Sequence, residues 1–133
     1  MLSSVAVITP YYKETNQILR TCHKSVLLQA PEVDHILVAD GHPNPSVEDW
    51  SCRHMILPSS HGDNGNTPRG VGALMTLAEG CQFVAFLDAD NWYHEGHIAS
   101  LLSLYKDTNS PVCCSCRTFH SIEGSMLNVK EVD

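Results

Sequence analysis

The sequence has no apolar segment close to the ~20 residues that a membrane-spanning helix needs, and its first residues lack the basic and hydrophobic regions of a signal peptide. Lys and Arg are also scarce: there are 8 of them, against 15 Asp and Glu, and they form no run. The formal charge of −7 repels the phosphate backbone of nucleic acids and anionic membranes. We therefore expect a cytoplasmic protein that has no membrane span and does not bind nucleic acid.

Disulfide and zinc frameworks are not indicated either, although the chain has six cysteines. The cysteines are scattered, and in a reducing cytoplasm they would stay unpaired. The densest group, Cys113-Cys114-Ser115-Cys116, lacks the C-x-x-C spacing of paired zinc ligands, and no second Cys/His pair stands at a zinc-site distance. We predict free cysteines in this segment rather than a metal site.

Glycine patterns that mark several common enzyme classes are missing. No G-x-G-x-x-G follows the first predicted strand, so a dinucleotide-binding loop is not expected there. The glycine-bearing loop 62–70 does not continue into Gly-Lys-Ser/Thr, which excludes a Walker A loop. There is no G-x-S-x-G elbow and no Ser/His/Asp order, so hydrolase chemistry of that type is not indicated.

The sequence does contain a regular alternation of strand and helix patterns. Its 133 residues, 43% of them hydrophobic, can bury one continuous core, and we expect a single domain over residues 1–133. Apolar, largely β-branched or aromatic runs predict strands at 5–9, 35–39, 54–57 and 83–87. Helical spacing predicts a helix capped by Thr15, a second helix that Thr67 caps with Pro68 at its first position, and a third around 98–105. A hairpin is expected between 112 and 129. This order predicts an α/β fold with a mostly parallel, doubly wound sheet covered by helices, and antiparallel character near the C-terminus.

Polar residues follow three of the predicted strands. Thr9 ends the first strand, Asp40 follows the second, and Asp88-Ala89-Asp90 follows the fourth, so all should meet at the sheet edge where ligands bind in such folds. Continued strand geometry would place the carboxylates of Asp88 and Asp90 on the same side. Two close carboxylates favour a cation between them, and oxygen ligands suit Mg²⁺ or Mn²⁺. The simpler alternative is a solvated turn.

Other side chains near this edge have both a functional and an ordinary interpretation. Asp40 is either a turn former before Gly41 or an acceptor for the ring N–H of a nucleobase. Arg69 lies where a loop enters a helix N-terminus, which favours an anion, although a surface arginine is the simpler interpretation. His94 and His97 could share a helix face near a metal, but solvated or capping histidines are more common.

Four segments, in this order and spacing, resemble the inverting GT-A glycosyltransferases of the family two type over residues 4 to about 106. The segments are 9–14, 38–41, 66–72 and 86–91. The resemblance implies a Rossmann-like GT-A three-layer sandwich. It also implies an activated sugar donor, most often a UDP-sugar, bound with Mn²⁺ or Mg²⁺.

The resemblance also implies roles for seven side chains around the donor. Thr9 and Tyr11 would flank the base, Glu14 would face the ribose or base, Asp40 would accept the base N–H, Arg69 would reach the nucleotide, Asp88 would contact the ribose or the metal shell, and Asp90 would hold the metal. One local departure concerns the Ala-Arg-Asn-x-Gly pattern of the family. This chain has Thr67-Pro68-Arg69-Gly70-Val71-Gly72, so Arg69 and Gly72 match while Gly70 replaces the Asn.

A second departure concerns the catalytic base. In the family this carboxylate usually lies in an acceptor-binding half, which cannot be placed before Asp133, and Glu131 and Asp133 stand in an unsuitable terminal position. We therefore expect a truncated donor-binding part whose catalytic residue and acceptor are unknown and whose homo-oligomeric state is open. The main alternative is a non-catalytic nucleotide-sugar-binding module that needs a partner chain. A nucleotidyltransferase should instead show a glycine- and basic-rich loop after the first strand, which 10–14 does not.

Overall fold

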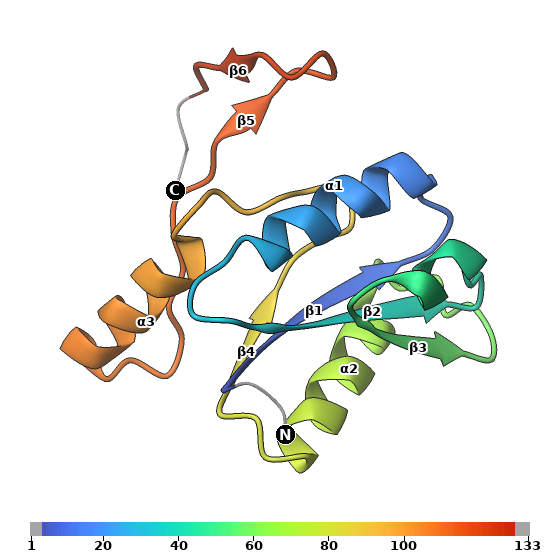
Figure 1. The fold of residues 1–133 in the computed structure, drawn as a ribbon, viewed down its shortest axis with the longest axis horizontal. Helices are drawn as coiled ribbons and strands as arrows, with labels where there is room; N and C mark the ends of the chain where they lie inside the picture. The colour runs from blue at the N-terminus through green and yellow to red at the C-terminus, as the bar shows by residue number, and fades with distance from the viewer. Residues whose placement is uncertain (1–3, 130–133) are drawn as a thin grey trace. The chain divides into compact units, whose positions relative to one another are not determined.

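A parallel sheet with the strand order β3-β2-β1-β4 occupies the centre of the first part of the chain (Figure 1). The computed structural model describes residues 4–129. The chain divides into two compact units, with the boundary in the sequence between Ala99 and Ser100. The strands are β1 (Val5–Tyr11), β2 (Asp34–Asp40), β3 (Arg53–Leu57) and β4 (Phe83–Phe86), and every neighbouring pair is parallel. The four strands expected from the sequence are confirmed, with ends that differ by one or two residues.

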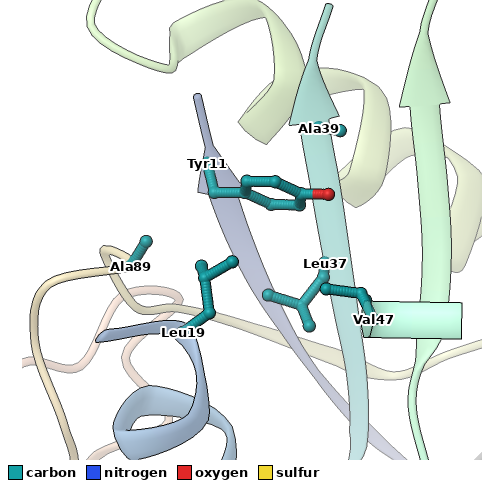
Figure 2. Close-up of a cluster of buried hydrophobic side chains, with 6 residues drawn as sticks. All are labelled: Tyr11, Leu19, Leu37, Ala39, Val47 and Ala89. Atoms are coloured by element: carbon teal, nitrogen blue, oxygen red, sulfur yellow. The ribbon is translucent and has the colours of Figure 1, made fainter. Parts of the chain in front are cut away.

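Alternation along β1 and β2 gives the sheet two apolar faces. One face packs against α1 (Asn16–Leu27), and Figure 2 shows the ring of Tyr11 on this face among Leu19, Leu37, Ala39, Val47 and Ala89. The other face carries a second core cluster, made of Ala6, Ile8, Ile36, Val38 and Cys81, and is covered by α2 (Asn66–Ala78). Helices on both faces confirm the expected α/β three-layer arrangement.

Gly72 sets how closely α2 approaches the sheet. A Cβ at this position would lie 2.8 Å from Cγ2 of Ile8 and 3.1 Å from Cγ2 of Val38. Both distances are shorter than ordinary van der Waals contact, so any side chain would push the helix away. Because α2 also supplies residues to the carboxyl edge of the sheet, this contact fixes their height above the strands.

The strand β1 continues past the point at which the sequence predicted its end. The strand was expected to end at Thr9, just before Pro10, but Pro10 pairs with Val38 and the strand ends at Tyr11. The carbonyl of Ile8 accepts from the N–H of Leu87 and therefore faces β4. The backbone nitrogen of Pro10 is directed to the same side, but β4 has already ended there. Pro10 therefore costs the sheet no backbone hydrogen bond, although it has no N–H to donate.

The start of α1 agrees with the prediction from the sequence, whereas the start of α2 differs from it. Thr15 caps α1 by accepting from the N–H of Ile18, as predicted. The prediction that Thr67 caps α2 is wrong, because the helix begins at Asn66, after Gly65 in a left-handed conformation. The carboxylate of Asp63 instead accepts from the N–H of Thr67, which leaves Thr67 inside the first turn.

The remaining elements are short. A 3₁₀ turn, η1 (Pro45–Asp49), lies between β2 and β3. The helix α3 (His97–Thr108) begins at the end of the first unit. In the second unit, β5 (Phe119–His120) and β6 (Met126–Leu127) form an antiparallel pair, which confirms the antiparallel character expected near the C-terminus. Among residues 4–129, no helix is long and apolar enough to cross a membrane. Glu131 and Asp133 lie outside the described residues.

Candidate functional site

A cavity of about 510 Å³ lies at the carboxyl edge of the sheet, in the first unit. It is bounded by the ends of β1 and β2, by the loop that enters α2, and by the turn after β4. Its lining residues are Pro10, Tyr11, Tyr12, Glu14, Asp40, Ser60, Gly62, Asp63, Asn64, Gly65, Pro68, Arg69, Asp88, Ala89 and Asp90. The strand order reverses at β1, so this is the position at which open α/β sheets bind ligands.

The carboxylate of Asp40 is buried at the end of β2, with the residue only 5% exposed. The backbone N–H of His61 donates to both of its oxygens, at 3.1 and 3.2 Å, and Nδ1 of His61 lies 2.9 Å from Oδ1. Burial alone would raise the pKa of Asp40, but the hydrogen bonds from His61 and from the backbone of Gly62 hold that pKa below its ordinary value. Asp40 is therefore an ionised, nearly enclosed acceptor at the cavity wall.

A second carboxylate, that of Asp63, holds the loop against the start of α2. Its Oδ2 accepts from the N–H of Thr67 at 2.9 Å and from the Thr67 hydroxyl at 2.5 Å, and these bonds lower the pKa of Asp63. Its Oδ1 is buried without a hydrogen-bond partner among the described residues. Asp63 was not among the residues expected at this edge, although an Asp just ahead of a helix is a recognisable capping signal.

Arg69 and Asp88 form an ion pair at the mouth of the cavity. Nη2 of Arg69 donates to Oδ1 of Asp88 at 2.7 Å, and Nη1 donates to Oδ1 of Asn66 at 3.2 Å. The Asp88 side chain is 56% exposed, so the pair stays close to solvent and contributes little to stability. The two side chains come from α2 and from the turn after β4, and their contact joins the two walls.

The strand geometry that would place the two carboxylates on one side does not continue as far as Asp90. β4 ends at Phe86, and the N–H of Asn91 donates to the carbonyl of Asp88, which closes a turn. Ala89 is buried against the α1 face while Asp88 and Asp90 on either side of it are exposed. The Asp90 carboxylate makes no hydrogen bond or ion pair within residues 4–129, and both carboxylates line the cavity. In that part of the chain, no three His, Cys, Asp or Glu side chains could together hold a metal.

Thr9 and Tyr11 are placed differently from the other predicted residues. The Thr9 side chain is fully buried and lies 2.9 Å from Nε2 of His35, and Thr9 does not line the cavity. The Tyr11 ring lies in the core, with its hydroxyl 2.6 Å from Nε2 of His54 (Figure 2). Both side chains fall on the α1 face, because they have the same strand parity. The Thr9 side chain is therefore used in packing alone, whereas Tyr11 packs in the core and also lines the cavity.

Glu14 lies at the cavity, but its carboxylate turns back to accept from the N–H of Tyr12 at 2.7 Å. His94 and His97 do not line the cavity, and the ring of His97 stacks on Tyr93 with centroids 4.2 Å apart. Burial, and then the neighbouring His94, lower the pKa of His97. The structure thus brings together Tyr11, Glu14, Asp40, Arg69, Asp88 and Asp90 at one cavity and leaves Thr9 and both histidines outside it.

The balance of charge in the cavity is strongly negative. Its lining includes the five carboxylates of Glu14, Asp40, Asp63, Asp88 and Asp90 and one cationic side chain, Arg69. A phosphate-bearing ligand would be repelled here unless a cation accompanied it. The lining therefore suits a neutral or hydrogen-bond-donating group near Asp40, and an anion with its own cation near Asp88 and Asp90.

Comparison with known proteins agrees with this architecture. Residues 6–127 match the family model described as Glycosyl transferase family 2. The chain belongs to glycosyltransferase family 2. The match covers all of the cavity residues, so the site described above is part of the family domain.

Two Staphylococcus aureus proteins are similar to this family 2 chain. It is 27% identical over 118 residues to the poly(ribitol-phosphate) β-N-acetylglucosaminyltransferase TarP of strain N315, which covers 82% of this chain and 35% of TarP. Its structure superposes on a crystal structure of S. aureus TarS with a TM-score of 0.62 at 20% identity, over 77% of this chain and 19% of that chain. The second likeness concerns the fold alone. The chain spans about a third of the length of the curated relative.

Proposed function

We propose that this family 2 domain binds a nucleotide-diphospho-sugar, with UDP as its nucleotide, for transfer of the sugar to an acceptor hydroxyl. The observation that carries the proposal is the cavity lining, which sets five carboxylates against one arginine at the carboxyl edge of the sheet. Such a lining accommodates a diphosphate only together with a divalent cation. The match to glycosyltransferase family 2 and the likeness to TarP support this choice of ligand.

Asp90 and Asp88 are the residues that would hold Mn²⁺ or Mg²⁺. Both metals prefer oxygen ligands, and Mg²⁺ commonly takes one or two carboxylates and completes its shell with water and substrate phosphates. The exposed Asp90 carboxylate, which has no hydrogen-bond or ion-pair partner within residues 4–129, fits this demand. When bound, the metal would supply charge stabilisation for the departing diphosphate.

The other side chains would position the donor. Arg69 is held at the cavity mouth by Asp88 and Asn66, from where its guanidinium can reach a phosphate or the ribose. The ionised Asp40 would accept a ring N–H of the base, and Glu14 would stand near the ribose. Tyr11, which lines the cavity at the end of β1, would flank the base, whereas the Thr9 side chain is fully buried and does not line the cavity.

A non-catalytic donor-binding module is the second candidate, and one observation favours it. Each cavity carboxylate already has a partner or a proposed ligand: Glu14 binds the Tyr12 N–H, Asp40 binds His61, Asp63 caps α2, Asp88 pairs with Arg69, and Asp90 would hold the metal. None of these carboxylates is left to deprotonate an acceptor. A missing general base typically costs about 10²–10⁴ in rate.

The two candidates predict different products when the chain is incubated with Mn²⁺ and a panel of labelled UDP-sugars, with and without acceptor alcohols. We expect donor binding and at most slow release of free sugar. Acceptor-dependent formation of glycoside at an ordinary enzymatic rate would overturn the module and show that a base is present. Absence of any UDP-sugar binding would overturn both candidates.

Replacing Asp40 by Asn should weaken UDP binding by about 1–3 kcal/mol, because an amide can keep its oxygen on His61 only by turning its NH₂ group toward the cavity. A base N–H would then meet a donor instead of an acceptor. ADP should bind the unmodified chain poorly, since adenine offers no ring N–H, and should gain relative to UDP in the variant. Isothermal calorimetry with both nucleotides tests this, with Asp107→Asn as the matched control on exposed α3. Equal affinity of the unmodified chain for ADP and UDP would contradict the role of Asp40.

A further inference from the structure

We propose that His61 is a positioning residue that orients the Asp40 carboxylate, so that the site selects a base with a ring N–H, such as uracil, over cytosine. This inference rests on the proposed function, because it concerns the same nucleotide site. His61 itself does not line the cavity, so it would act through Asp40.

The hydrogen bonds divide the two oxygens of Asp40 unequally. Oδ1 receives the His61 backbone N–H at 3.1 Å and faces Nδ1 of the ring at 2.9 Å, which fills both of its lone-pair directions. Oδ2 receives a share of the same backbone N–H at 3.2 Å and a long bond from the Ser60 hydroxyl at 3.5 Å. An ionised carboxylate only accepts, so Nδ1 of His61 carries the proton. The backbone N–H of Gly62 also donates to this carboxylate. Because Oδ1 is filled and the two bonds given for Oδ2 are shared or long, Oδ2 is the oxygen better able to accept from a ligand.

The backbone fixes His61 in this place. Gly41, directly after Asp40, has a φ of +78°, and a Cβ there would lie 2.4 Å from the N of Ser60 and 2.7 Å from the C of Ser59. The loop therefore packs directly against the end of β2 one residue before His61. At the other end of the loop, Asp63 holds the first turn of α2. The ring of His61 is thus delivered to Oδ1 by a segment held at two points.

The groups around the Asp40 carboxylate determine how its pKa changes when the His61 ring is removed. Burial opposes the ionisation of Asp40, whereas the His61 ring and two backbone N–H groups favour it. The negative charge of Asp40 in turn acts to raise the pKa of nearby Asp63. Loss of the His61 ring removes one of the hydrogen bonds that stabilise the ionised carboxylate, so the pKa of Asp40 rises. A protonated Asp40 donates a hydrogen bond, which suits the bare N3 of cytosine and opposes the N3–H of uracil.

The experiment compares the 133-residue chain with His61→Ala and His61→Asn, because an Asn amide can supply an N–H near the position of Nδ1. Calorimetry measures the Kd values of UDP and CDP with Mn²⁺ at about pH 7.5 and about pH 5, on either side of the usual histidine range. We expect His61→Ala to weaken UDP about tenfold. We also expect its preference for UDP over CDP to collapse at the lower pH, while the unmodified chain and His61→Asn keep that preference at both pH values.

The outcomes separate this inference from the proposed function. If the unmodified chain does not bind UDP, the proposed function fails. If the unmodified chain prefers UDP to CDP and His61→Ala keeps the same preference at both pH values, the proposed function stands and the positioning role of His61 is overturned. An equal, pH-independent loss for both nucleotides in both variants would also overturn it, since that pattern indicates only a distorted loop.

Discussion

Acidification from about pH 6.5 to about pH 4.5 should steeply lower the free energy of unfolding of this chain, because two histidines are buried in their neutral forms. His23 and His35 are 5% and 2% exposed, and their Nδ1 atoms lie 2.8 Å apart. Burial, and then the neighbouring His23, lower the pKa of His35 to about 3, and burial also lowers the pKa of His23. Protonating both rings would set two N–H groups against each other.

The direction of the effect follows from proton binding. Below the ordinary histidine pKa of about 6.5, each of these histidines is protonated in the unfolded chain but stays neutral in the folded chain. The free energy of unfolding therefore falls by about 1.4 kcal/mol per histidine for each pH unit. The full stability is present above that range and is lost as the pH falls toward about 3. The lowered pKa values of Asp40 and Asp63 act in the same direction, but only below about pH 4.

Urea unfolding at a series of pH values measures this slope. His35→Gln should reduce the slope of the free energy of unfolding between about pH 4.5 and 6.5 by about 1.4 kcal/mol per pH unit, the contribution of one proton. This holds whatever the effect of the substitution on stability at neutral pH. His42→Gln, which changes an exposed histidine against the edge of Tyr12, should leave the slope unchanged. A flat profile for the unmodified chain over this window would show that the His23–His35 pair is not held neutral by burial.

Replacing Asp90 by Asn should abolish the metal-dependent part of the stabilisation that UDP gives to the chain. A ligand at about 100 times its Kd stabilises the folded state by about 2.7 kcal/mol, which corresponds to a shift in Tm on the order of 10 °C for a chain of this size. We expect such a shift with UDP and Mn²⁺, and a much smaller one with UDP and EDTA. The Asp90 carboxylate has no other partner within residues 4–129, so its loss should not change the Tm without ligand.

Thermal unfolding with UDP in the presence of Mn²⁺ or EDTA checks this prediction. Asp107→Asn is the matched control, because it removes the same charge from an exposed position of α3. A metal-dependent shift that persists at full size in Asp90→Asn would remove Asp90 from the metal site. A shift lost equally in both variants would point to net charge rather than to a ligand.

The order of elements and the edge at which the site lies could be predicted from the sequence. The run from Val5 to Thr9 and the run from His35 to Ala39 are buried on both sides, and each is followed by a helix or turn signal. In a parallel sheet, residues that end such strands meet at one edge, so the convergence of Asp40, Asp88 and Asp90 follows from topology alone. The exact strand ends did not follow, because Pro10 is tolerated where β4 has already stopped.

The direction of individual side chains was harder to predict. Thr9 and Tyr11 were both expected at the base, and both share the parity of Val5 and Val7 and pack on the α1 face. On that face Tyr11 still lines the cavity, whereas Thr9 does not. A shift of one residue changes the face, and the sequence does not show which face of a strand buried on both sides adjoins the cavity. The turn at Asp88 could not be predicted from the sequence either, because it depends on the packing of Ala89 into the core.

Contacts between distant loops lay beyond the sequence. His61 binds Asp40 across 21 positions of the chain, and nothing in the loop from Ser59 to Asn66 indicates that it folds back onto the end of β2. The only local sign is Gly41, whose positive φ allows the close approach. A glycine after a strand has many other causes, so it did not identify the partner.

We propose that a divalent cation binds at the Asp88–Asp90 turn together with a nucleotide diphosphate. NMR spectroscopy of the ¹⁵N-labelled chain tests it directly, because Mn²⁺ broadens the amide signals of residues near it. With UDP present, substoichiometric Mn²⁺ should broaden the signals of Ala89, Asp90 and Asn91, and much less so without UDP or in Asp90→Asn. If these three signals stay sharp, or if the strongest broadening falls on Cys113–Cys116, the metal does not bind at the Asp88–Asp90 turn.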